Sequence, residues 1–76
     1  MPDHTYKVID LVGSSPDGVD QAIRNAVERA NRTLRGLDWF QVTEIRGHIE
    51  NGSIGHFQVS LKVGFQIIDD ASLTQG

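Results

Sequence analysis

One tryptophan, one glutamine and one arginine are the side chains of this 76-residue chain best suited to binding a ligand. Trp39, the only tryptophan, has a flat indole that can stack on a planar molecule. The Gln58 amide holds a donor and an acceptor in one plane, which matches the amide or imide edge of a heteroaromatic ring. Arg46 supplies a fixed charge for a phosphate or a polar tail. Alternatively, Trp39 is a core or subunit-interface residue, and Gln58 and Arg46 are solvated strand residues.

Catalytic and metal-binding chemistry has less support. The three histidines, His4, His48 and His56, lack metal-ligand spacing on any one element, and the chain has no cysteine. We therefore expect no metal site. Ser15 has no paired base and is better explained as a helix cap than as a nucleophile. The sequence thus predicts a protein that is not an enzyme.

Composition excludes several classes of protein. The chain has 7 Lys+Arg against 10 Asp+Glu, a net charge of −3 that argues against a dedicated nucleic-acid binder. No apolar run approaches the ~18 residues of a membrane span, and the first residues contain no apolar signal core, so we expect a cytoplasmic protein without a membrane partner. A hydrophobic fraction of 38% in so short a chain predicts marginal stability alone. Oligomerisation, ligand binding or both are expected to stabilise it.

The elements expected to position these side chains begin with a strand over Tyr6–Val12, which is rich in β-branched and aromatic residues. A helix follows, with Ser15 as its N-cap and Pro16 at its first position. Apolar residues then recur at spacings of three and four from Val19, and Gly36 provides a stop. This pattern predicts a helix of about 20 residues.

Two further strands, 38–49 and 54–68, are separated by Asn51-Gly52, a strong hairpin signal. If the third strand pairs antiparallel with both others, the sheet order is 1-3-2. The predicted fold is therefore α+β, a βαββ unit in which one long helix lies on a three-stranded antiparallel sheet. We expect residues 1–68 to form a single domain and the tail 69–76 to be frayed.

The second strand changes phase, which predicts a β-bulge near Thr43-Glu44. A three-residue hairpin loop with Gly52 in the left-handed conformation is expected to correct the register further. The bulge would place Phe40, Val42, Ile45 and Ile49 under the helix. The outer face would then carry the polar and aromatic set Trp39, Arg46, His48, His56, Gln58 and Lys62.

With these residues in place, the chain resembles the bacterial dodecins over nearly its whole length. The similarity lies in the blocks K-V-I-x-L-V-G-S-S, L-D-W-F-x-V-T-E-I-R-G-H-I and Q-V-x-L-K-V-G-F, and in the helix end at Ala30 to Leu34. Dodecins are small βαββ flavoproteins that assemble as hollow shells of twelve subunits. The resemblance implies that neighbouring subunits cover the bare sheet face and the edges.

The resemblance also implies the ligand and its contacts. Dodecins stack pairs of flavins between tryptophans of symmetry-related chains, and Trp39 matches that tryptophan. Gln58 matches the glutamine that binds the pyrimidine edge, and Arg46 an arginine near the polar chain of the flavin. Gln66 stands where many bacterial members have arginine, which weakens the expectation of a phosphate contact there. Some members bind coenzyme A, for which Arg29 and Arg35 are the candidates.

The sequence therefore predicts a flavin storage, buffering and photoprotection protein, with FMN as the leading ligand and riboflavin or FAD as further candidates. In this hypothesis the Trp39 indole reduces the excited flavin and quenches it. One alternative is a small oligomeric flavin-dependent enzyme that uses His48 or His56 in acid–base chemistry. Another is a purely structural oligomer with Trp39 as an interface anchor.

Overall fold

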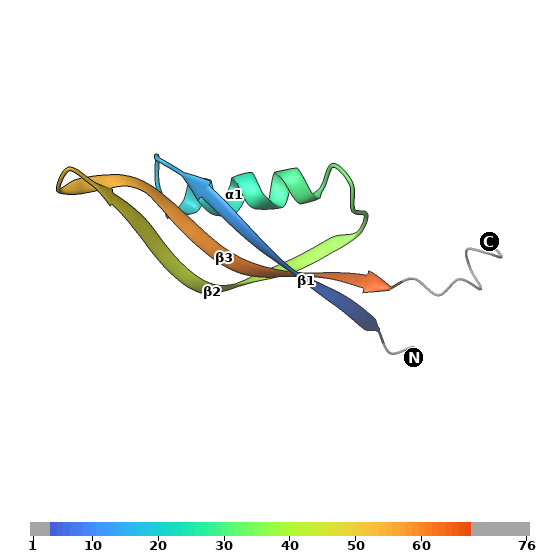
Figure 1. Ribbon diagram of the computed structural model, residues 1–76. Coiled ribbons are helices and arrows are strands. Elements are labelled where there is room, and N and C mark those ends of the chain that lie inside the picture. Colours follow the sequence, from blue (N-terminus) through green and yellow to red (C-terminus); the bar gives the residue numbers. More distant parts are fainter. Residues whose placement is uncertain (1–3, 68–76) are drawn as a thin grey trace.

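The computed structural model describes residues 4–67 and contains one helix and three strands in this part of the chain (Figure 1). The elements follow one another in the order β1 (Thr5–Ser15), α1 (Val19–Ala30), β2 (Leu37–Glu50) and β3 (Ser53–Ile67). The βαββ order is therefore confirmed. The predicted tail 69–76 lies outside the described residues.

The three strands form one antiparallel sheet in the order β1-β3-β2, as the sequence predicts. β3 is the central strand, as its alternating side chains predict, and it pairs with β2 from Ser53 to Phe65 and with β1 from Phe57 to Ile67. Its odd-numbered residues Val59, Leu61 and Val63 face α1 and are buried. From His56 onward, its even-numbered residues face the opposite side, which we call the outer face.

The helix is shorter than predicted, with 12 residues instead of about 20. After Ala30 the chain tightens: the Thr33 and Leu34 N–H groups both donate to the Ala30 carbonyl oxygen, at 3.2 and 3.0 Å. The chain then turns into β2 through Gly36, whose φ of 71° is in the left-handed region. The apolar spacing beyond Ala30 therefore belongs to a turn and a loop.

The start of the helix also differs from the prediction. Ser15 is the last, buried residue of β1, and its Oγ accepts a hydrogen bond from the Asp17 N–H at 2.9 Å. This bond closes a local turn and does not cap the helix. The N-cap residue is Gly18, with φ of 150° and no side-chain cap. The prediction that Ser15 and Pro16 begin the helix is wrong, because the chain needs a turn between β1 and α1.

The hairpin between β2 and β3 is a two-residue turn. Asn51 and Gly52 both have positive φ, 51° and 80°, and Glu50 pairs with Ser53. This is a type I′ geometry, which suits the twist of the strands. The predicted three-residue loop is therefore wrong.

The register correction expected of that loop is supplied by a bulge in β3. Ile49 pairs with Ile54, but His48 pairs with His56, so Gly55 is left without a partner. A second shift between Val42 and Glu44 confirms the bulge predicted near Thr43, and a third lies between Leu37 and Trp39. The predicted outer-face set does share one face, although a bulge at Gly55, and not a longer hairpin loop, supplies one of the register shifts.

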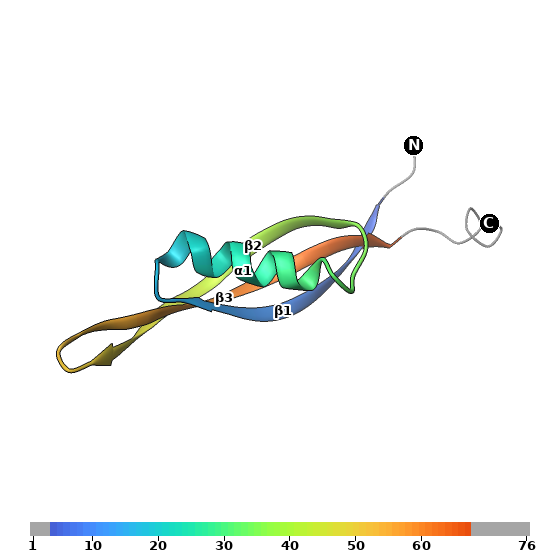
Figure 2. The same ribbon diagram turned by 90° about the horizontal axis from the view of Figure 1, so that it is seen from above.

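The core is small and lies between α1 and the two strands β1 and β3 (Figure 2). Three alanines of α1 allow the helix to approach the sheet closely; they are Ala22, Ala26 and Ala30. The closest approach is at Gly13, where an added Cβ would overlap the Ala22 carbonyl oxygen and lie 2.9 Å from the Ala26 Cβ.

The inward-facing apolar residues of β2 are mostly uncovered. Val42 packs against the core, but Phe40, Ile45 and Ile49 are 51%, 55% and 71% exposed. They do not pack under the helix as predicted, because α1 ends at Ala30 and lies over β1 and β3. A groove of about 380 Å³ separates α1 from Phe40.

The chain is also too extended to be a self-sufficient globule. Its radius of gyration is 16.0 Å, against about 11 Å expected for a compact domain of this length. The long β2–β3 hairpin projects beyond the helix in both views (Figures 1 and 2). Apolar surface thus remains exposed on both faces of the sheet.

Replacing Gly13 with alanine should destabilise the fold, because the new methyl group has no space beneath α1. Overpacking of this kind costs about 1–3 kcal/mol in the free energy of unfolding. Denaturant unfolding at one fixed protein concentration measures the loss, and Ser14→Ala is the matched control because Ser14 is exposed. Equal unfolding midpoints for both variants would show that the helix does not approach the sheet this closely.

Candidate ligand-binding site

Trp39 lies on the outer face, over the backbone of the central strand. Its register partner is Gly64, and a Cβ added there would lie 2.7 Å from the indole Nε1 and closer still to the ring carbons. The indole therefore takes the place of a side chain on β3, and the strand supports it from below. Trp39 nevertheless remains 39% exposed, which is unusual for the largest aromatic side chain of a chain with so few aromatics.

Tyr6 lies beside this tryptophan, although it belongs to the opposite edge strand. The two ring centroids are 6.2 Å apart and the planes meet at 64°, an edge-to-face contact across Gly64. Desolvation by the surrounding groups and, next, the Asp38 carboxyl group raise the pKa of Tyr6 above its usual value. Tyr6 is therefore neutral at physiological pH and presents an uncharged ring.

Gln66 follows Gly64 on the same face of β3 and pairs with Tyr6 in the register. Its amide contacts the Nδ1 of His4. We call this group, Tyr6, Trp39, Gly64 and Gln66, the aromatic end of the outer face. It brings together two of the predicted binding residues, Trp39 and Gln66.

Gln58 and Arg46 lie opposite one another farther along the sheet, near the hairpin. Gln58 is half-buried, whereas Arg46 is exposed and its guanidinium pairs with the Glu44 carboxylate at 3.1 Å. The next pair toward the turn on this face is His48 and His56. We call this group, Arg46, His48, His56 and Gln58, the histidine end.

The two ends are separated within one chain. Gln58 and Gly64 are six positions apart in β3, roughly 20 Å at the rise of a strand. Between them, the Lys62 ammonium group pairs with the Asp10 carboxylate at 3.0 Å. Trp39 and Gln58 therefore share a face, as predicted, but cannot contact the same ring of one ligand from a single subunit.

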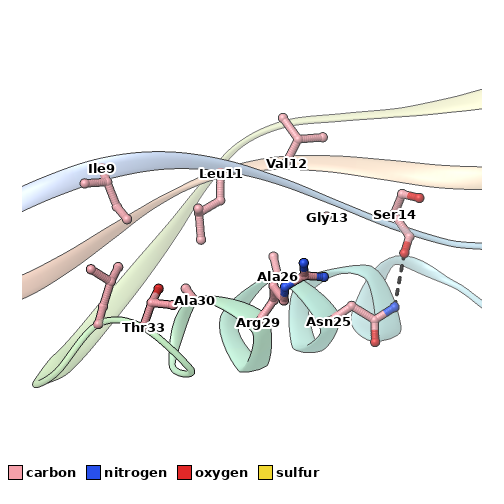
Figure 3. Close-up of a pocket in the computed structure, with 11 residues that line it drawn as sticks. Ile9, Leu11, Val12, Gly13, Ser14, Asn25, Ala26, Arg29, Ala30 and Thr33 are labelled. Atoms are coloured by element: carbon pink, nitrogen blue, oxygen red, sulfur yellow. Dashed lines mark hydrogen bonds between the residues drawn. The ribbon is translucent and has the colours of Figure 1, made fainter.

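The arginines considered for coenzyme A lie elsewhere. Arg29 lines a groove of about 490 Å³ between β1 and α1, with Asn25 and Thr33 beside it (Figure 3). The Asn25 amide donates to the Ser14 carbonyl oxygen at 3.1 Å at one end of this groove. Arg35 follows the helix and does not line the groove. The groove is on the helix side of the sheet, away from Trp39.

Sequence reasoning missed Tyr6 and Gly64 as parts of the aromatic end. The alternation of β1 places Tyr6 on the outer face, and this signal was present in the sequence. Gly64 could not be identified in the same way, because its role depends on the register that sets it opposite Trp39. Among residues 4–67, no helix has the length and apolar character needed to cross a membrane.

Comparison with known proteins agrees with this architecture. Residues 5–68 match the family model described as Dodecin. The dodecin of Thermus thermophilus is 50% identical over 62 residues, covering 82% of this chain and 90% of that protein. The calcium dodecin of Mycobacterium tuberculosis is 31% identical over 62 residues, covering 82% and 87%.

A solved structure shows the same fold at higher identity. The dodecin of Streptomyces coelicolor superposes with a TM-score of 0.85 at 61% identity, over 91% of this chain and 99% of that one. Its agreement with the βαββ unit and the 1-3-2 sheet extends across nearly all the described elements. The chain therefore belongs to the dodecin family.

Proposed function

We propose that this chain is a non-enzymatic flavin-binding protein that stores, buffers and photoprotects its ligand, with FMN as the leading candidate. The observation that carries the proposal is the exposed Trp39 indole, held over Gly64 on the outer face. An isoalloxazine is a planar ring system with a polar edge, and an exposed, supported indole is a suitable stacking surface for it.

The surroundings of Trp39 hold its indole in a position where a planar ligand can stack on it. β3 supports the indole from below and Tyr6 contacts it at the edge, so little side-chain freedom is lost when a ligand binds. Each stacked aromatic pair adds about 1 kcal/mol beyond the area that it buries. Placing the electron-rich indole against the flavin would also allow it to reduce the excited flavin and return it to its ground state.

The separation of the two ends supports a site shared between subunits. Trp39 of one copy and Gln58 of another are brought together if two outer faces meet about a two-fold axis, since such an interface repeats each contact twice. The exposed apolar residues on both faces and the extended shape supply the surface for such assembly. We propose a homo-oligomer, with twelve subunits as in the dodecin shell.

In this shared site the polar residues recognise different parts of the flavin. The half-buried Gln58 amide would bind the pyrimidine edge, and Arg46 would lie near the polar chain. Gln66, beside Trp39, offers an uncharged amide to the same chain, which suits hydroxyl groups as well as a phosphate. The groove at Arg29 is the candidate binding site for the phosphates of coenzyme A. Arg35 lies outside this groove and is therefore a weaker candidate for contacting them.

Replacing Trp39 with alanine should weaken FMN binding at least tenfold, about 1.4 kcal/mol, because the stacking surface is lost. Titration of FMN fluorescence measures affinity and quenching together. Trp39→Phe separates the two effects, since a phenyl ring still stacks but is a poorer electron donor; we expect weaker quenching of the FMN that remains bound. Equal affinity and equal quenching for wild type and Trp39→Ala would contradict the proposed site.

Replacing Gln58 with alanine should weaken FMN binding by about 1–3 kcal/mol, because one or two buried hydrogen bonds to the ligand are lost. The Kd from the same fluorescence titration gives the change. Gln21→Ala is the matched control, since Gln21 lies on α1 and bonds only to Asn25 among the described residues. An unchanged Kd in Gln58→Ala would mean that Gln58 does not bind the flavin edge.

The titration of Tyr6 reports on the surface around Trp39. The raised pKa of Tyr6 means that the folded state favours the neutral ring. Its contribution to the stability of the fold is therefore present at neutral pH and is lost as the pH rises through that pKa. Tyr6 is the only tyrosine, so the ultraviolet absorbance of tyrosinate follows it directly. We expect a midpoint above that of free tyrosine, and a lower midpoint in Asp38→Asn. A midpoint that Asp38→Asn leaves unchanged would exclude the carboxyl group as a cause.

A further inference from the structure

The β2–β3 hairpin brings together two histidines, His48 and His56, whose spacing in the sequence is not typical of metal ligands on a single strand or helix. His48 and His56 are register partners, and their rings are stacked with centroids 5.3 Å apart and planes 24° from parallel. The expectation of no metal site rested on spacing along one element. Cross-strand pairing removes that ground, because facing positions of two strands can supply two ligands to one ion.

A carboxylate lies next to this pair because of the bulge at Gly55. The Glu50 side chain occupies the space above Gly55, where an added Cβ would lie 2.7 Å from Oε1. Its other oxygen, Oε2, is 3.7 Å from the Nε2 of His48. Any side chain at position 55 would displace Glu50 from this place, so the glycine leaves room for the carboxylate beside the His48 imidazole.

We propose that His48 and His56, with Glu50 as third ligand, bind a divalent transition-metal cation such as Zn²⁺. Two imidazole nitrogens and one carboxylate oxygen are a common ligand set for zinc, with a solvent molecule completing a tetrahedron. At Zn–N distances of about 2.0–2.1 Å, the two nitrogens stand roughly 3.3 Å apart. The facing rings would reach this separation if their edges tilted toward one another, and the exposed His48 side chain can rotate at small cost.

The ligand types select the class of ion. Imidazole favours zinc, copper and nickel, whereas calcium prefers six to eight oxygen ligands. Among residues 4–67, no group of three or more ligand side chains already converges on one point, so Glu50 would have to change rotamer to complete the proposed set. One relative is named calcium dodecin, but a single carboxylate beside two histidines does not suit that ion.

The proposed cation site does not depend on flavin binding. It lies two register pairs beyond Arg46 and Gln58, toward the turn, and uses none of the residues assigned to the flavin. It can therefore be tested on flavin-free protein, and its failure would leave the proposed function intact.

The direct test is calorimetric titration of ZnCl₂ into tag-free, flavin-free protein. We expect saturable binding by wild type. His48→Gln or His56→Gln should weaken zinc binding more than tenfold, because mutating even a residue that only hydrogen-bonds to a metal ligand lowers metal affinity by about tenfold or more. His4→Gln is the matched control and should leave the Kd unchanged. Acidification should weaken binding, because protons compete for the imidazoles. CaCl₂ should give no signal that depends on His48 or His56.

A second measurement uses the wild-type protein alone, so it holds even if a variant fails to assemble. Diethylpyrocarbonate modifies accessible imidazoles, and peptide mass mapping separates His4 from His48 and His56. We expect zinc to protect His48 and His56 and to leave the modification of His4 unchanged. No zinc binding by wild type, unchanged binding in the variant that carries both substitutions, or equal protection of all three histidines would overturn the proposal.

Discussion

The structure depends on one packing constraint: a 12-residue helix covers only part of one face of a long three-stranded sheet. Close approach at Gly13 and the alanines of α1 bury Val59, Leu61 and Val63, and little else. The apolar side of β2 and the whole outer face are left for other contacts. Each face of the sheet thus leaves a surface that a neighbouring molecule could cover. The candidate ligand-binding surface is the outer face, which the helix does not cover.

Bulges then decide which side chains occupy the outer face. A strand with an uninterrupted period of two would send part of its charged set into the core, at a high cost in free energy. The unpaired positions in β2 and Gly55 in β3 each shift the register by one residue. Their combined effect sets Trp39 over Gly64 and Arg46 opposite Gln58. It also brings His48 against His56, so the same devices that protect the core assemble the two polar ends.

Much of this could be predicted from the sequence, because the responsible signals are local. Alternation in β3, Asn51-Gly52 and the phase change near Thr43 gave the sheet order, the hairpin and one bulge. The helix length could not be predicted, since the spacing of Leu34 and Leu37 continues the helical pattern although they pack from a turn and a strand. The hairpin loop was predicted wrongly because a loop residue and a bulge residue change parity equally. Only the register distinguishes them.

The candidate site was predictable in composition but not in arrangement. Residue chemistry identified Trp39, Gln58 and Arg46, and family resemblance added Gln66, Arg29 and Arg35. The sequence did not reveal that Trp39 and Gln58 lie roughly 20 Å apart in one chain, because that distance follows from their places in the sheet. Because of this separation, Trp39 and Gln58 can bind one flavin only if they come from two different subunits.

Native mass spectrometry of the wild-type protein with FMN can show whether the flavin site is shared between subunits, since it resolves flavin content for each oligomeric state. We expect that flavin is retained by the assembled protein and is absent from any monomer released from it. A monomer that retains FMN as firmly as the oligomer would contradict a site built from two copies.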